Sequence, residues 1–355
     1  MKNRFFTPLF LITFLFSSLI LFLVSSEAVD GPRSCKKDAA VEAILVTTGV
    51  DNPFILKGTT TAIDQCAEEP DEYKVKFYSV ALCLTEPYTA GGGTAPDYST
   101  CTTILDTAKE VNLKPGIDVN LLDGEINLPL GSYTHLAIII DNHLKIKHKQ
   151  KYVLASDKTS AATIFGNTSG SGAWCWTVAA GITTYTGQTY DSAYATAQGI
   201  TPVASGTTAA GDPVAARLKC GSAVPSGFDA STDATYFATE IIDHMGDDAT
   251  FVGHADYGSI TVEADTGITD IEIAANMLTT TNTLASTEDE SRRISQIYKY
   301  DTPIIIAENT NSFKLKVTTY ASVSIDMSVD DSDVIWGAKV GGDPFIIQVE
   351  TGTGE

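Results

Sequence analysis

The stretch "LPLGSYTHLAIIID", residues 128–141, decides the fold that the sequence favours. Pro129 and Gly131 are typical turn residues, and the apolar run 136–140 follows them closely. Proline is tolerated at a turn or a sheet edge, and glycine supplies the backbone freedom that a turn requires. The stretch therefore predicts a turn that leads directly into a buried strand of a β-sheet.

Two side chains at the start of this strand, Tyr133 and His135, have structural rather than catalytic roles in our interpretation. The ring of Tyr133 can be buried while its hydroxyl reaches back to a loop carbonyl and locks the corner. Alternation along a strand places His135 on the same face as Tyr133 and Ala137. No serine, cysteine or carboxylate partner is identifiable by motif, so we predict no catalytic residue here and no enzyme activity for the chain.

Other segments repeat the strand signal. Residues 73–84, "YKVKFYSVALCL", alternate in polarity, and the step from Phe77 to Val80 breaks the period of two. That break predicts a β-bulge near Tyr78 and Ser79. Strands at this spacing, divided by Gly, Pro, Asp and Asn, are typical of sandwiches. We predict a mostly β protein, an antiparallel β-sandwich of immunoglobulin-like or prealbumin-like type, with long loops and one short helix.

Composition divides the chain into four segments. Residues 1–28 carry two basic residues and then an apolar run, which predicts a signal peptide cleaved near Ala28, or an uncleaved signal-anchor. Residues 29–155 form the predicted sandwich domain, and residues 156–285 a Gly/Ser/Thr/Ala-rich β region or insertion. Residues 286–355 begin with a predicted helix to Tyr298, capped loosely by Ser286 and Asp289, and C-terminal strands that could complete a sandwich follow.

The order of four stretches resembles a known group of domains. "YKVKFYSVALCL", "ILD", "VNLLDG" and "LPLGSYTHLAIIID" occur in this order within residues 73–141. The chain is similar there to secreted bacterial domains with a prealbumin-like (transthyretin-like) sandwich, in which an "LPxGxYT" turn leads into a buried strand. The matching positions are Leu128, Pro129, Gly131, Tyr133 and Thr134. The resemblance implies a fold rather than an activity, since such domains mostly have no assigned reaction.

The charge balance limits the partners of the chain. Its net charge is −21, and removal of residues 1–28 takes away two basic and one acidic side chain, which leaves −22. Repulsion then works against nucleic acid and anionic membrane surfaces. We expect other copies of the chain or cell-surface components as partners, and membrane contact only if the signal segment stays uncleaved.

The cysteine count points to an oxidising compartment. Six cysteines, an even number without a CxxC pair, are typical of disulfides in an exported chain. Each pair of sequence neighbours brackets a polar, turn-rich segment. We therefore expect the pairs Cys35–Cys66, Cys83–Cys101 and Cys175–Cys220 in a secreted or cell-surface protein.

The acidic stretch "DHMGDDATFVGHAD", residues 243–256, is the strongest candidate metal site. Zinc and other divalent ions use imidazoles and carboxylates as ligands. The candidates are Asp243, His244, Asp247, Asp248, His254 and Asp256. A second acidic stretch with Asp326, Asp330, Asp331 and Asp333 could bind calcium. Neither spacing matches a standard signature, and solvated acidic turns explain both, so we expect no cofactor, with a Ca or Zn ion as the alternative.

The basic stretch "HLKIKHKQKY", residues 143–152, carries four lysines at alternate positions. In one extended strand Lys145, Lys147, Lys149 and Lys151 share a face. The first interpretation is an edge strand that lysines protect against unwanted pairing. The second is a cationic stripe that docks on an acidic face of another copy.

These patterns favour an exported, disulfide-bonded structural or adhesive surface protein, with self-assembly into a filament or another extracellular assembly as a further expectation. The alternative is a ligand-binding module for a glycan, through Trp174 and Trp176, or for a divalent metal, through residues 243–256. A metal-dependent hydrolase is the third hypothesis.

Overall fold

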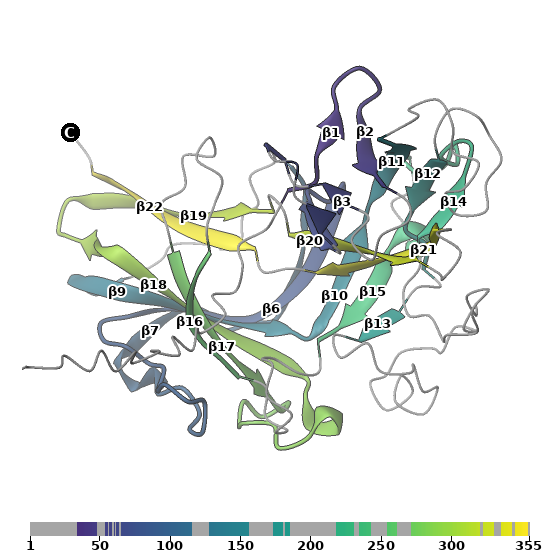
Figure 1. Cartoon of the computed structure of the whole chain (residues 1–355). Coiled ribbons are helices and arrows are strands. Elements are labelled where there is room, and N and C mark those ends of the chain that lie inside the picture. Colours follow the sequence, from purple (N-terminus) through teal and green to yellow (C-terminus); the bar gives the residue numbers. More distant parts are fainter. Residues whose placement is uncertain are drawn as a thin grey trace, which may run out of the picture.

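The computed structural model describes residues 34–47, 54–55, 57–58, 60, 62–63, 65–115, 128–155, 173–179, 182–184, 218–230, 234–242, 254–260, 271–319, 322–329, 335–342 and 345–353. These residues lie mostly in strands, as Figure 1 shows, and the helical elements among them are the short 3-10 turns η1 (Tyr98–Thr100), η2 (Ala234–Tyr236) and η3 (Glu288–Glu290). The predicted mostly β class is confirmed. Within the described ranges no helix is long and apolar enough to cross a membrane, and the predicted signal segment lies outside them.

The largest sheet has ten strands. Its path is β13 (Ile182–Thr184), β15 (Ala238–Ile241), β10 (His143–Lys147), β6 (Glu72–Cys83), β9 (Gly131–Asp141), β18 (Arg293–Ile306), β17 (Ile271–Leu278) and β16 (His254–Ile260). Two further strands, β7 (Cys101–Leu105) and β8 (Lys109–Leu113), also pair with β6. The sheet takes strands from all three segments after residue 28, so the compositional boundaries do not divide it.

Three smaller sheets complete the described fold. The seven-stranded one runs β14 (Lys219–Gly221), β12 (Ala173–Trp176), β11 (Lys149–Leu154), β2 (Ala43–Val46), β3 (Phe54–Ile55) and β4 (Ala62–Ile63), with β1 (Lys37–Asp38) also on β2. The others are β21 (Ile335–Gly342), β20 (Val323–Val329) and β5 (Gln65–Glu68), and β19 (Thr310–Thr318) with β22 (Ile346–Thr353). Pairing between described strands is antiparallel except for β11 with β2 and β13 with β15.

The main core lies between the ten-stranded sheet and the C-terminal strands. Phe345, which immediately precedes β22, meets the rings of Tyr73 and Phe77 edge-on, with centroids 6.1 and 5.9 Å apart. The hydroxyl of Tyr298 on β18 donates to the Phe345 carbonyl over 2.8 Å. Apolar residues of β19, β20 and β22 join the same cluster as those of β6, β9 and β18. This packing of one sheet on others is the sandwich arrangement that the sequence predicts.

The turn at 128–141 is built as expected. The Tyr133 hydroxyl donates to the Pro129 carbonyl over 2.9 Å, and the ring is buried. His135 is only 5% exposed, and its Nδ1 lies 2.8 Å from the Thr134 hydroxyl. Burial lowers the pKa of His135. The register of β6 on β9 shifts between Phe77 and Ser79, which confirms the predicted bulge.

The predicted helix from Ser286 to Tyr298 is wrong. The chain makes only the turn η3 and then enters β18 at Arg293. The Ser286 hydroxyl does donate a hydrogen bond to a later carboxylate. The acceptor is Glu290, 2.5 Å away, and not the predicted Asp289. β18 pairs with β9 on one side and β17 on the other. Apolar burial within this three-strand array outweighs the local capping preference.

Two disulfides form where the sequence predicts them. Cys35–Cys66 and Cys83–Cys101 are both formed, which confirms two of the three expected pairs. Cys175 is also disulfide-bonded, and Cys220 stands opposite it in the register of β12 and β14. The third pair stays a prediction that this register supports.

We expect the protein to expose no reactive thiol when it is unfolded without reductant, because all six cysteines should be paired. Maleimide labelling in denaturant, read as added mass, measures this directly. A reduced sample of the same protein is the control and should take up six labels. Two labels on the unreduced sample would contradict the third pair, and more would contradict the framework.

Candidate functional site: a buried polar corner between two sheets

The chain passes from one sheet to another at His148. β10 ends at Lys147 in the ten-stranded sheet, and β11 begins at Lys149 in the seven-stranded sheet. β10 lies between β15 and β6, and β11 lies between β12 and β2. The prediction of a single edge strand over residues 143–152 is therefore wrong. A one-residue step between two sheets has the same sequence alternation as one continuous strand, so the pattern did not reveal it.

The predicted lysine stripe is also corrected. Lys147 is only 2% exposed, whereas Lys145 and Lys149 are partly exposed and bind Glu110 and Asp229. Lys151 is half-buried on β11. The four side chains do not form one solvent-facing row because strand pairing and ion pairs hold them in different surroundings.

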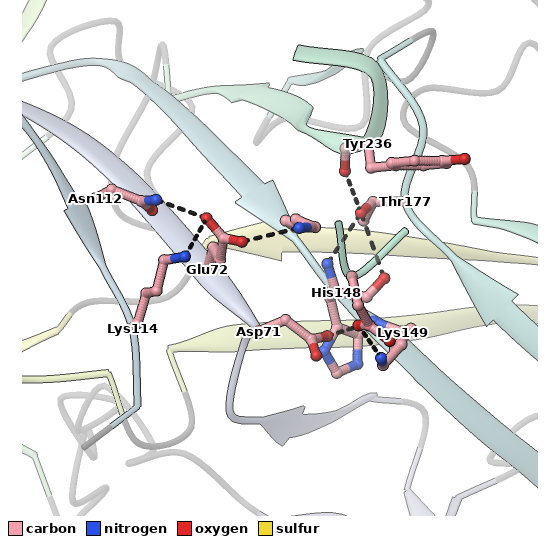
Figure 2. A network of polar contacts seen from close by, with 10 residues as sticks. Asp71, Glu72, Asn112, Lys114, His148, Lys149, Thr177 and Tyr236 are labelled. Atoms are coloured by element: carbon pink, nitrogen blue, oxygen red, sulfur yellow. Dashed lines mark hydrogen bonds and ion pairs between the residues drawn. The ribbon is translucent and has the colours of Figure 1, made fainter. Parts of the chain in front are cut away.

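The Glu72 carboxylate is the centre of the corner (Figure 2). Its Oε1 lies 2.8 Å from the Lys147 Nζ, and its Oε2 accepts a 2.6 Å hydrogen bond from the Asn112 amide. The Lys114 Nζ lies 3.2 Å from the same Oε2. Lys147 and Glu72 stand directly opposite each other on β10 and β6. One buried carboxylate thus joins three adjacent strands, β10, β6 and β8.

The electrostatics keep this carboxylate ionised. Burial alone raises the pKa of Glu72, but the hydrogen bonds from Asn112, Lys147 and Lys114 outweigh burial and bring the pKa to about 2. At neutral pH the Glu72 side chain is therefore a carboxylate, and it lies against the buried Nζ of Lys147. Such a pair stabilises the fold only while both partners are present.

An aromatic residue covers the ammonium of Lys147. Phe228 is fully buried, and its ring centroid lies 5.1 Å from the Nζ atoms of both Lys147 and Lys149. The Phe228 ring packs in turn on Tyr236, with centroids 5.1 Å apart. A cation held over a ring face is attracted by the ring quadrupole, most strongly where water is absent. Phe228 therefore shields the Lys147 ammonium and stabilises its charge.

The backbone on the far side of the corner is fastened by Thr177. The amide of His148 donates to the Thr177 hydroxyl over 2.9 Å, and that hydroxyl donates to the Tyr236 carbonyl over 2.6 Å (Figure 2). Burial, with the charge of Lys37, lowers the pKa of the His148 ring to about 3. His148 is thus a neutral, buried residue at neutral pH.

Asp71, next to Glu72, holds the start of β11. Its carboxylate accepts a 2.9 Å hydrogen bond from the Lys149 amide (Figure 2). Burial raises the pKa of Asp71, against the lowering effect of this hydrogen bond. The corner therefore combines ion pairs within the ten-stranded sheet with backbone hydrogen bonds that hold the start of the seven-stranded sheet. It leaves a buried amine beside a carboxylate and an amide.

The predicted metal site is described only in part. Asp243, His244, Asp247 and Asp248 lie outside the described residues. Asp256 on β16 accepts hydrogen bonds from the Tyr88 hydroxyl (2.5 Å) and the Gly91 amide (2.8 Å), which lower its pKa. It therefore holds the loop between β6 and β7 onto the sheet. Close to it, a Cβ at Gly92 would meet the His254 ring at 2.1 Å.

No group of three or more metal-ligating side chains occurs in the part of the chain that the structure describes. In the second acidic stretch, Asp326 lies on β20, and Asp330, Asp331 and Asp333 fall outside the described ranges. Both metal hypotheses therefore stay predictions.

The two tryptophans of the glycan hypothesis lie on β12. Trp176 is buried and lies so close to Gly221 that a Cβ there would come within 3.2 Å of its ring. Trp174 is half-buried. Trp176 is thus packed inside the seven-stranded sheet region and offers no free face to a sugar.

Sequence reasoning identified Lys147 but missed Glu72 and Asn112. The available signals were Glu72, a charged residue immediately before the predicted strand 73–84, and the basic stretch 143–152. Which strands are neighbours is a non-local property, so the sequence did not show that the three residues meet.

Comparison with known proteins finds no family model that matches the chain, and no similar curated protein or solved structure. The resemblance to prealbumin-like domains stays a prediction.

Proposed function

We propose that the chain is an exported structural or adhesive component of a cell surface or an extracellular assembly. The observation that carries the proposal is the way disulfides and a buried ion pair hold strands to their neighbours. The disulfides Cys35–Cys66 and Cys83–Cys101 join described strands and their flanks, and both are consistent with a secreted or extracellular protein. The Glu72 corner adds a buried ion pair between β10 and β6. Such cross-bracing suits a protein that must keep its shape outside the cell.

Export is tested in the source cells. We expect the chain in the extracellular or surface fraction, without residues 1–28 and with its cysteines oxidised when thiols are blocked before lysis. N-terminal sequencing and thiol labelling of each fraction measure this. A reduced chain confined to the cytoplasm would contradict the proposal.

For assembly we propose a different strand from the one that the lysine pattern suggested. β19 pairs with β22 in a two-stranded sheet, so among the described strands its other edge has no partner. Ser312, Lys314 and Lys316 are exposed on one face of β19, and Leu315 on the other face is buried. A cationic open edge on a chain with net charge −21 is complementary to the acidic surface of a second copy.

We expect replacement of Lys314 and Lys316 by glutamate to abolish self-association while the fold is retained, because both side chains are exposed. The wild-type assembly should also weaken as salt rises, since exposed charges are screened beyond about 10 Å at 0.1 M ionic strength. Light scattering at high protein concentration measures both effects. The matched control is Lys145→Glu with Lys151→Glu on the interior strands β10 and β11. A loss of assembly in this control alone would contradict the assignment to β19.

A further inference from the structure

Three side chains with complementary chemistry meet on one face of the ten-stranded sheet. Lys147 extends from β10, Glu72 from β6 and Asn112 from β8. The Lys147 Nζ lies 2.8 Å from one oxygen of the Glu72 carboxylate, and the Asn112 Nδ2 donates to the other oxygen over 2.6 Å. A single carboxylate therefore holds an amine and a carboxamide side by side.

The surroundings of the amine and the amide favour a reaction between them. Lys147 is only 2% exposed and lies under Phe228. The carbonyl oxygen of Asn112 is buried and has no hydrogen-bond partner among the described residues. A buried ammonium and an unsatisfied carbonyl both cost free energy. Conversion of the ammonium into a neutral amide would remove the buried positive charge, and the Glu72 carboxylate would keep its ion pair with Lys114.

We propose that Lys147 and Asn112 condense into an intramolecular amide, with Glu72 as the proton carrier between the two nitrogens. Glu72 takes a proton from the Lys147 ammonium only in passing, as the Nζ attacks Cγ of Asn112, so the carboxylate is ionised before and after the step. An Nζ–Cγ bond forms and the Cγ–Nδ2 bond breaks, while Glu72 passes protons from Nζ to Nδ2. The leaving group departs as ammonium and Glu72 ends ionised, so atoms and charge balance without any oxidant or co-reactant.

Positioning is the main contribution of the fold to this step. Amides are weak electrophiles, but side chains held in contact react with effective concentrations far above those of free reactants. The carboxylate between them supplies general acid–base catalysis in a site that is shielded from water. The product would link β8 to β10 across β6. This modification is independent of the assembly role proposed for β19.

The test uses the wild-type protein, reduced, alkylated and digested with trypsin. Pro115 blocks cleavage after Lys114, so Asn112 falls in the peptide 110–145, and an amide at Lys147 blocks cleavage there. We expect peptide 110–145 joined to peptide 146–149, with a mass lower by one ammonia, about 17 Da. Separate peptides with unmodified Lys147 and Asn112 would overturn the proposal.

The identity of the two linked residues and the mass lost on linking distinguish the alternatives. A link from Lys147 to Glu72, with loss of one water, or a link that uses Lys114 instead of Lys147, would also overturn the proposal. In the Glu72→Gln variant we expect the link to be lost. In Asn112→Asp the same link should form with loss of water, about 18 Da, in place of ammonia.

The matched control is Lys145→Arg, which keeps a cation beside Glu110 two residues away on β10. This variant should form the link as the wild type does. Circular dichroism and the thiol count show whether each variant is folded. If Glu72→Gln does not fold, the wild-type digest and Asn112→Asp still decide the question.

Discussion

In protein that carries no Lys147–Asn112 amide, replacement of Lys147 by methionine is expected to lower the free energy of unfolding by about 3–5 kcal/mol, the usual cost of leaving one member of a buried ion pair without its partner. Glu72 would keep Asn112 and Lys114 but lose the buried ammonium opposite it. Methionine has a similar length, so little packing is lost. Urea denaturation with a constant m value measures the change.

The control for this experiment is Lys145→Met on the same strand. Lys145 binds Glu110 at a partly exposed site, so its loss should cost less than about 1 kcal/mol. Asn112→Ala keeps the Lys147–Glu72 pair and removes the proposed amide, which separates the two contributions. Equal losses for Lys147→Met and Lys145→Met would show that the corner does not stabilise the fold.

Acid is expected to destabilise the protein strongly between about pH 6.5 and pH 3. In the folded state the pKa of His148 is about 3, so the ring stays neutral above that pH. In the unfolded chain the ring binds a proton with a pKa near 6.5. The unfolded state therefore binds more protons in this window, and the stability that His148 contributes is lost as the pH falls through it. The full difference corresponds to about 5 kcal/mol. Chemical denaturation at several pH values measures it.

Glu72 acts in the same direction at lower pH. Its pKa of about 2 lies below the usual value of 4.5, so its contribution is present above pH 4.5 and is lost as the pH falls towards 2. Burial raises the pKa values of Glu68 and Asp71, which therefore oppose the loss. The His148→Leu variant isolates the histidine, because its stability should fall much less between pH 6.5 and 4.5. An unchanged slope in this variant would contradict the buried neutral ring.

Local patterns were sufficient for much of the fold. The turn before β9, the Tyr133 hydrogen bond and the bulge in β6 depend on a few consecutive residues, and all are present. The Cys83–Cys101 disulfide closes a loop between neighbouring strands, so sequence proximity predicted it correctly.

The remainder depends on contacts between distant segments. Residues 286–298 carry a capping pattern, yet β9 and β17 recruit them into a strand. Residues 143–152 alternate as one strand, yet they divide at His148 because β6 and β2 belong to different sheets. The Glu72 corner could not be predicted from local patterns either. Its members Glu72, Asn112 and Lys147 come from strands that are separated along the chain.

Negative-stain microscopy of the purified protein at low salt tests the proposed structural role most directly. We predict filaments or discrete oligomers of regular shape that disappear in the Lys314→Glu, Lys316→Glu double variant. Uniform monomers of the wild type, at concentrations where light scattering also finds no larger species, would contradict a structural role through self-assembly.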